Sequence, residues 1–404
     1  MAMGPGARSR ILISADSHVE ESDAVWERIP AHLRKYCPTV EWREHGGFIL
    51  SIEGQRSSFA MGGPAAEIDY EKEFRRDPSG GTDLARRKRD MAREGIDAEV
   101  VFPNLGLGLG CGDVPSEFRC AQARAYNDWV FELFAPEAQR FRPVGLLPVD
   151  EVELAVAEAK RCIAKGFRSV TIPPSVPWRP YFLPGWEPLW ALLEECGTLL
   201  GFHVFTGNLA SGADFASLLD VPRSAFEVAQ HSARLEAKLT ERTERLSSTV
   251  IGMAAGMAPI VHLISGGVLE RHPELRFIVT EAECGWLAWT LQAMDQMQER
   301  RHLSLPPLEQ KPSEYFLRQG AVTFTDDPVA LHNLALTGSS CLLWSNDYPH
   351  DEGIYPGSAP VVERIAAQLS EADAENVFSR NAARLYGFDL DYLAAHKAEL
   401  SESI

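Results

Sequence analysis

The sequence contains few cysteines, and none of them forms a C-x-x-C pair. Seven cysteines are scattered along 404 residues, at positions 37, 111, 120, 162, 196, 284 and 341. This pattern excludes a disulfide framework of the kind found in small secreted domains, and it excludes a zinc site built from cysteines. Reduced thiols and a cytoplasmic location are therefore the simpler expectation.

Long hydrophobic runs and an excess of basic residues are also missing. No apolar stretch approaches the roughly 20 residues that span a bilayer, and the first ten residues have no apolar core of signal-peptide length. The formal net charge of −18 argues against a nucleic-acid or anionic-membrane partner. What remains is an ordinary globular composition, with 45% hydrophobic and 24% charged residues and no internal repeat.

Helical and strand patterns alternate along most of the chain. Eight strand candidates lie near residues 11, 98, 142, 168, 199, 276, 322 and 342. A helical pattern separates most neighbouring pairs, and alternation of this kind predicts an α/β fold with a parallel sheet. Eight such units favour a closed (β/α)8 TIM barrel, with residues 1–404 forming a single domain.

An open doubly wound sheet is the alternative fold. It would need a glycine-rich phosphate turn after an early strand. The glycines at 106, 108, 110 and 112 follow a strand, but they alternate strictly with other residues, so no register gives G-x-G-x-x-G. The barrel is therefore the preferred prediction.

Two stretches interrupt the alternation and are predicted to be insertions. Residues 38–62 have the pattern of a β-hairpin, within an insertion of about 38–80 after strand 1. Residues 207–247 are mixed and charged, and we expect a helical insertion after strand 5. A glycine-rich loop is predicted over 103–115.

Metal-binding residue types stand at the predicted carboxyl ends of several strands. The strand at 11–13 leads into Asp16-x-His18, whose two side chains would point to the same face. His203 ends strand 5, and Asp347 follows strand 8. Because function collects at the carboxyl ends of barrel strands, these four side chains would surround one divalent ion. Two imidazoles and two carboxylates suit Zn²⁺ or Mn²⁺, with Fe²⁺ as an alternative.

Further acids and a histidine follow strands 6 and 8. Glu281 and Glu283 follow strand 6, where the alternative reading is a favourable charge at a helix amino terminus. His350 comes three residues after Asp347 and could exchange a proton near neutral pH. Asp347, His350 and Glu281 are therefore the candidate catalytic residues.

The candidates for substrate contacts are Asn104, Arg168, Trp178, Arg179 and Glu283. Arginine suits a carboxylate because its guanidinium group can donate two parallel hydrogen bonds. A surface salt bridge is an equally good interpretation of each arginine.

Several stretches match a known set of motifs in the expected order along nearly the whole chain. They are Asp16-x-His18, His203, Ser345–His350, Gly266–Pro273, Tyr126–Trp129 and Asn381–Gly387. Together they resemble the amidohydrolase superfamily, and more narrowly its amidohydrolase 2 branch, which includes aminocarboxymuconate semialdehyde decarboxylase and resorcylate decarboxylase. Two positions depart from the family pattern. Asp16 stands where many relatives have His or Glu, and Glu281 stands where the decarboxylases often place a histidine base.

The resemblance implies a metal-dependent TIM barrel that acts on a small aromatic or unsaturated carboxylic acid. Non-oxidative decarboxylation is the commonest chemistry of this branch, and hydrolysis of an amide, lactone or C–C bond by a metal-activated water is the alternative. A non-enzymatic alternative is a degenerate barrel that acts as a binding protein, but none of the four expected ligands is lost from the sequence. A homodimer is a further hypothesis, with little support in the sequence.

Overall fold

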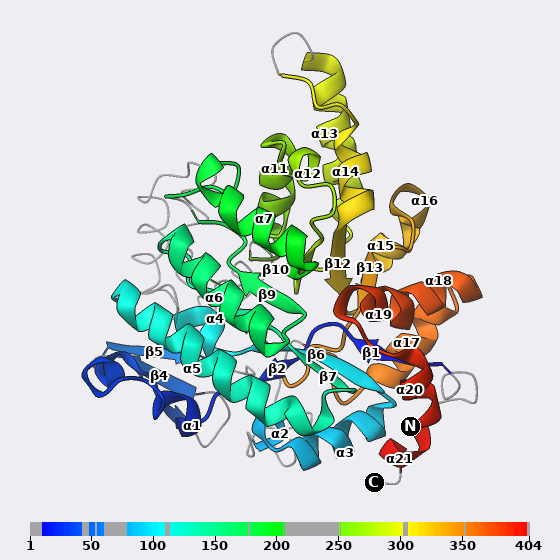
Figure 1. The fold of residues 1–404 in the computed structure, drawn as a ribbon. Helices are drawn as coiled ribbons and strands as arrows, with labels where there is room; N and C mark the ends of the chain where they lie inside the picture. Colours follow the sequence, from blue (N-terminus) through cyan, green and yellow to red (C-terminus); the bar gives the residue numbers. More distant parts are fainter. Residues whose placement is uncertain are drawn as a thin grey trace, which may run out of the picture.

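The computed structural model places short strands at the centre of the molecule and helices outside them (Figure 1). It describes residues 10–42, 48–52, 55–59, 79–109, 114–176, 178–204, 206, 250, 252–301, 306–350 and 353–401. Within these ranges, no helix is both long and apolar enough to cross a membrane.

Each of the eight predicted strand positions holds a strand, and the first and third are split in two by a short break. The central strands are β1 (Ile13–Ser14), β2 (His18–Val19), β6 (Ala98–Pro103), β7 (Phe141–Pro143), β8 (Gly145–Leu146), β9 (Ser169–Ile172), β10 (Leu199–His203), β11 (Phe277–Thr280), β12 (Gly320–Phe324) and β13 (Leu342–Trp344). All their pairings are parallel, in the order β1-β6-β7 and β8-β9-β10-β11-β12-β13.

Backbone hydrogen bonds join these two groups of strands at both sides. The amide of Ala15 donates to the carbonyl of Trp344 over 3.0 Å, which links β1 to β13. The amide of Val144 donates to the carbonyl of Val101 over 2.9 Å, which links β6 to the break between β7 and β8. The strands therefore close into the α/β barrel that the sequence predicts.

The barrel interior and the helix–strand interface bury alternate residues of the same strand. In β6, Ala98, Val100 and Phe102 belong to the interior cluster, whereas Val101 belongs to the outer core under the helices. Because both faces of a strand are covered, β6 is buried at every position.

Residues from the C-terminal part of the chain close the amino-terminal end of the barrel. The interior cluster includes Tyr386, Phe388 and Leu393, which pack with the first residues of several strands, such as Ala98 and Leu199. They come from α19 (Asn381–Tyr386), α20 (Leu390–Ala395) and the turn between these helices. The opposite, carboxyl-terminal end of the barrel is where the polar residues described below meet.

Helices connect the strands. The main ones are α3 (Leu84–Glu94), α5 (Ser116–Phe134), α6 (Val152–Lys165), α7 (Glu187–Cys196), α11 (Met257–Ser265), α13 (Leu287–Arg301), α14 (Pro312–Gln319) and α17 (Ser358–Ala366). Gly95 ends α3 in the left-handed conformation, as its position in the sequence predicts. Asp83 caps the start of α3 by accepting from the amide of Arg86.

Two local predictions differ from the structure. The predicted hairpin has a third strand, so that β3 (Thr39–Trp42), β4 (Phe48–Ile52) and β5 (Gln55–Phe59) form an antiparallel sheet. The predicted glycine-rich loop contains a short helix, α4 (Leu105–Leu109). The helical insertion predicted over 207–247 lies outside the described residues.

Candidate metal centre

Two buried histidines present a ring nitrogen to the carboxyl end of the barrel. His18 Nδ1 lies 2.8 Å from the carbonyl oxygen of Pro103, and His203 Nδ1 lies 2.7 Å from that of Val204. A carbonyl oxygen can only accept, so each Nδ1 carries a proton, and each Nε2 can offer a lone pair to a metal when the ring is neutral. This second hydrogen bond is the usual way in which proteins orient a metal-binding imidazole.

Two buried aspartates face those lone pairs. Asp16 Oδ1 lies 3.5 Å from His18 Nε2 and 3.6 Å from His203 Nε2, and Asp347 Oδ1 lies 3.3 Å from His18 Nε2. Both carboxylate oxygens of Asp16 and both Nε2 atoms are buried without a hydrogen-bond partner in the described part of the chain. Buried acceptors without donors are costly, and a cation between them would remove that cost.

The separations between these atoms fit a shared ion. Ligands at about 2.0–2.2 Å from one metal lie about 3.0–3.6 Å from each other in tetrahedral or octahedral geometry. The observed distances of 3.3–3.6 Å match that spacing. Asp16, His18 and His203 therefore form one group that can hold a metal ion, and His18 also belongs to a second group with Asp347, Glu281 and His350. A single ion held by Asp16, His18, His203 and Asp347 together stays a prediction.

Glu281 and His350 extend this group on the side of Asp347. His350 Nδ1 lies 3.0 Å from Asp347 Oδ1 and 3.5 Å from Glu281 Oε1, while Glu281 Oε2 lies 3.2 Å from His203 Nδ1. The rings of His350 and His18 stack with 3.9 Å between their centroids. All three candidate catalytic residues thus touch one another or a candidate metal ligand.

Burial and charge set the protonation of this group. Burial raises the pKa of Glu281 to about 8, although nearby histidines oppose the shift. Burial alone would lower the pKa of His350, but Asp347 and Glu281 outweigh it and raise the pKa well above the usual value. The pKa of His18 falls well below its usual value because of burial and the nearby His350. His350 and Glu281 therefore hold protons near neutral pH, and His18 is neutral.

The backbone is strained at the same place. Glu281, Glu283 and Asp347 have φ angles of 62°, 47° and 54°, which are rare for residues other than glycine. Strain of this kind is stored at functional sites when the surrounding structure enforces it. At Asp347 the backbone amide is held by the carbonyl oxygen of Asp16, 3.2 Å away.

The structure does not bring every predicted substrate-binding residue to this group. Asn104 does reach it, because its Oδ1 lies 3.4 Å from His350 Nε2. Glu283 instead accepts a hydrogen bond from the Thr325 hydroxyl, which fixes the end of β12. In the hydrogen bonds described for them, Glu281 and Glu283 do not cap the following helix, α13. The amides of Cys284 and Gly285, just before α13, donate instead to the carboxylate of Asp327.

Of the remaining three candidates, only Arg168 lies at the opposite end of the barrel, and the roles of Trp178 and Arg179 stay predictions. Arg168 is exposed and directly precedes β9, so it stands at the amino-terminal end of the barrel. Arg179 forms a surface salt bridge with Glu151 at 2.8 Å, the alternative that the sequence left open. The side chain of Trp178 is 60% exposed.

Arg87 is an important residue that the sequence did not single out. Its buried guanidinium group donates to Glu99 Oε2 over 2.6 Å, to the carbonyl oxygen of His18 over 2.6 Å and to Ser17 Oγ over 2.7 Å. It therefore holds the backbone between the ligands Asp16 and His18 from behind. Arg87 lies in a run of basic residues, 86–89, in which only the folded structure distinguishes the buried member.

We expect Arg87→Met to weaken metal binding by about 10–100-fold, the usual effect of losing a residue that orients a metal ligand. The variant will also be less stable, because the buried carboxylate of Glu99 loses its partner. Two controls separate these effects. Glu99→Gln should keep the contacts of Arg87 to residues 17 and 18, and Arg89→Met alters an exposed arginine on the same helix. Metal affinity should be measured by titration well below the melting temperature, and an unchanged affinity in folded Arg87→Met would contradict the positioning role.

The comparison with protein families agrees with the site. A family model described as Amidohydrolase matches residues 16–388, from the first candidate ligand to the turn after α19. The chain belongs to the amidohydrolase family. This assignment confirms the resemblance seen in the sequence motifs, and it makes the protein a metal-dependent enzyme of the amidohydrolase superfamily.

Individual relatives of this amidohydrolase are distant. A gamma-resorcylate decarboxylase from Rhodococcus jostii (strain RHA1) is 24% identical over 286 residues, which are 66% of this chain and 77% of that protein. An amidohydrolase from Mycobacterium avium subsp. paratuberculosis K-10 superposes with a TM-score of 0.69 at 18% identity, covering 95% of this chain and 99% of that one. A dihydroxybenzoic acid decarboxylase from Polaromonas sp. JS666, solved with manganese and 2-nitroresorcinol, gives a TM-score of 0.62 at 18% identity, covering 94% and 97%. The structural likenesses show the shared fold.

Proposed function

We propose that this amidohydrolase uses one divalent metal ion to decarboxylate a small aromatic or unsaturated carboxylic acid without oxidation. The observation that carries the proposal is the contact of 3.0 Å between His350 and Asp347, beside His18. It places the imidazole of His350, which holds a proton, next to the carboxylate of Asp347, which is a candidate metal ligand. The names of the relatives from Rhodococcus and Polaromonas, both decarboxylases, support the same reaction.

Asp16, His18, His203 and Asp347 would hold the ion, and Zn²⁺ or Mn²⁺ suits this mixture of nitrogen and oxygen ligands. Manganese is the ion in the Polaromonas enzyme. When bound, the metal supplies a positive charge that binds and polarises the substrate carboxylate or a neighbouring oxygen.

The side chains of Asp347 and His350 supply the proton that decarboxylation requires. The bond between the carboxylate carbon and the substrate carbon breaks, carbon dioxide leaves, and the electron pair stays on the substrate carbon, which takes a proton. His350, whose Nδ1 lies 3.0 Å from Asp347 Oδ1, would donate that proton. Glu281, 3.5 Å from the same nitrogen, is placed to restore it, and Asn104 contacts the other side of the ring.

Hydrolysis is the alternative reaction for the same residues, with Asp347 taking a proton from water instead of giving one to carbon. A panel of aromatic carboxylic acids, amides and lactones, tested with the metal-loaded enzyme in heavy water and in ¹⁸O-labelled water, separates the two. We expect carbon dioxide release, one deuterium at the vacated carbon and no ¹⁸O in the organic product. Turnover that places ¹⁸O in the product, without release of carbon dioxide, would show hydrolysis and overturn the proposal.

A further inference from the structure

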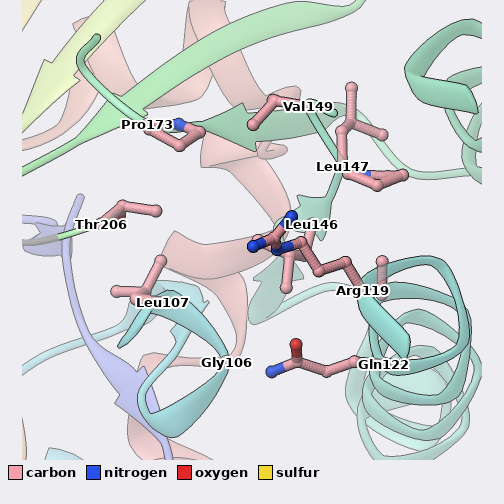
Figure 2. Close-up of a pocket in the computed structure, with 11 residues that line it drawn as sticks. Gly106, Leu107, Arg119, Gln122, Leu146, Leu147, Val149, Pro173 and Thr206 are labelled. Atoms are coloured by element: carbon pink, nitrogen blue, oxygen red, sulfur yellow. The ribbon is translucent and has the colours of Figure 1, made fainter. Parts of the chain in front are cut away.

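A small pocket with a mostly apolar wall and a few polar side chains lies at the carboxyl-terminal end of the barrel, near the candidate metal centre. Arg119 and Gln122 reach into it from α5, and Leu107 and Thr206 face them from the other side (Figure 2). Leu146 ends β8 and Pro173 follows β9, and both add apolar surface to the pocket wall. None of these residues belongs to the group that can hold the metal.

Short chain connections keep this pocket close to the residues that can hold the metal. Thr206 comes three residues after His203, so their Cα atoms are at most about 11 Å apart. Gly106, also in the pocket wall, comes two residues after Asn104, which contacts His350, so that separation is at most about 7 Å. A molecule the size of a substituted benzoic acid can span such distances.

Two residues that line the pocket each carry a buried polar atom without a partner in the described part of the chain. The side chain of Gln122 is 1% exposed, and its Nε2 has no hydrogen-bond partner among the residues that the structure describes. The same holds for the hydroxyl oxygen of Thr206, a residue that is 3% exposed. Buried amide and hydroxyl groups are almost always hydrogen-bonded in folded proteins. Their arrangement therefore fits an occupant that carries a hydrogen-bond acceptor, which the amide of Gln122 can donate to.

The charge in the pocket indicates what kind of acceptor. Arg119 is the cation of the pocket wall, and its Nη1 forms a close ion pair with the carboxylate of Asp150. The positive charge is therefore already balanced, so a second carboxylate would find no net countercharge there. An uncharged oxygen can accept from Gln122 without that penalty, and the apolar wall suits an aromatic ring.

We propose that this pocket binds an uncharged oxygen substituent, such as a hydroxyl or methoxy group, on the side of the substrate ring away from the reacting carboxylate. This inference rests on the proposed function for the placement of that carboxylate at the metal. Gln122 and Thr206 are then residues that determine specificity, and they take no part in the proton transfer itself.

The test measures binding instead of turnover, so it can succeed even if decarboxylation fails. The manganese-loaded enzyme is titrated with benzoate, 3-hydroxybenzoate, 4-hydroxybenzoate and benzene-1,4-dicarboxylate. We expect at least one hydroxybenzoate to bind about tenfold more tightly than benzoate, the gain from one or two good hydrogen bonds. The dicarboxylate should bind no more tightly than benzoate.

Two nearly isosteric variants, Gln122→Leu and Thr206→Val, complete the test. Each should reduce the preference for the hydroxybenzoate while leaving the affinity for benzoate and the metal content unchanged. Equal affinities for benzoate and both hydroxybenzoates in the unaltered enzyme would overturn the inference, since the pocket would then hold only water. Tighter binding of the dicarboxylate, or an equal loss for all four ligands in the variants, would also overturn it.

Discussion

Asp347→Asn is expected to lower kcat by about 1000-fold, the middle of the range for losing a positioned proton-transfer group. Asparagine keeps the shape of the side chain but lacks the negative charge that Asp347 places 3.0 Å from His350 Nδ1. Asparagine keeps a side-chain oxygen that can still bind a metal, so we expect the variant to keep most of its metal. Release of carbon dioxide under saturating substrate, together with metal content, measures both effects.

The backbone conformation at residue 347 can accommodate asparagine. Asp347 has a φ of 54°, and asparagine tolerates this left-handed conformation better than most residues. A loss of activity would therefore report chemistry and not misfolding. Asp326→Asn is the matched control, because Asp326 is an exposed carboxylate that pairs with Arg364. An Asp347→Asn enzyme with a tenth or more of the original kcat would rule out the assigned proton transfer.

His203→Ala is expected to remove both bound metal and turnover. The imidazole of His203 is fully buried, and its loss deletes one of four ligands while leaving Asp16 with one fewer partner. Elemental analysis after dialysis should find far less than one metal ion per chain, against about one for the unaltered enzyme.

His332→Ala is the control for this experiment. His332 is exposed on the short helix α15 (Pro328–His332) and contacts only the carbonyl oxygen of Pro328 in the hydrogen bonds described for it. Its replacement should leave metal content and activity unchanged. If His203→Ala retained a stoichiometric metal ion and full activity, the ligand set would be misassigned.

The sequence can predict that the candidate ligands approach one another because a barrel imposes a simple geometry on them. Asp16, His18, His203 and Asp347 each follow or end an apolar strand, and parallel strands bring all such positions to one end. The spacing of the strands was enough to infer which residues would meet, although the residues lie more than 300 positions apart.

The same reasoning could not place residues whose role depends on neighbours remote in sequence. Arg168 is a candidate substrate contact by residue type, but it precedes β9 and so lies at the amino-terminal end of the barrel. The helix α4 has a glycine-rich sequence that does not favour a helix. It nevertheless forms where the carboxylate of Glu21, more than 80 residues away, accepts from the amides of Leu105 and Gly106.

The position of Arg87 also depends on a residue that no local sequence pattern identifies, namely its partner Glu99. Its neighbours in the run 86–89 are chemically similar, and no periodic pattern reveals which of them turns inward. Only the buried carboxylate of Glu99, on the adjoining strand, decides that Arg87 supports the backbone of His18. Tertiary pairing of this kind is absent from any local pattern.

Anomalous X-ray diffraction from crystals of the manganese-loaded enzyme would test the metal centre most directly. The result that we expect is one strong peak about 2.0–2.3 Å from Asp16, from Nε2 of His18 and His203, and from Asp347. A peak bound to other side chains, or its absence between these four under saturating manganese, would contradict the centre on which the proposed chemistry depends.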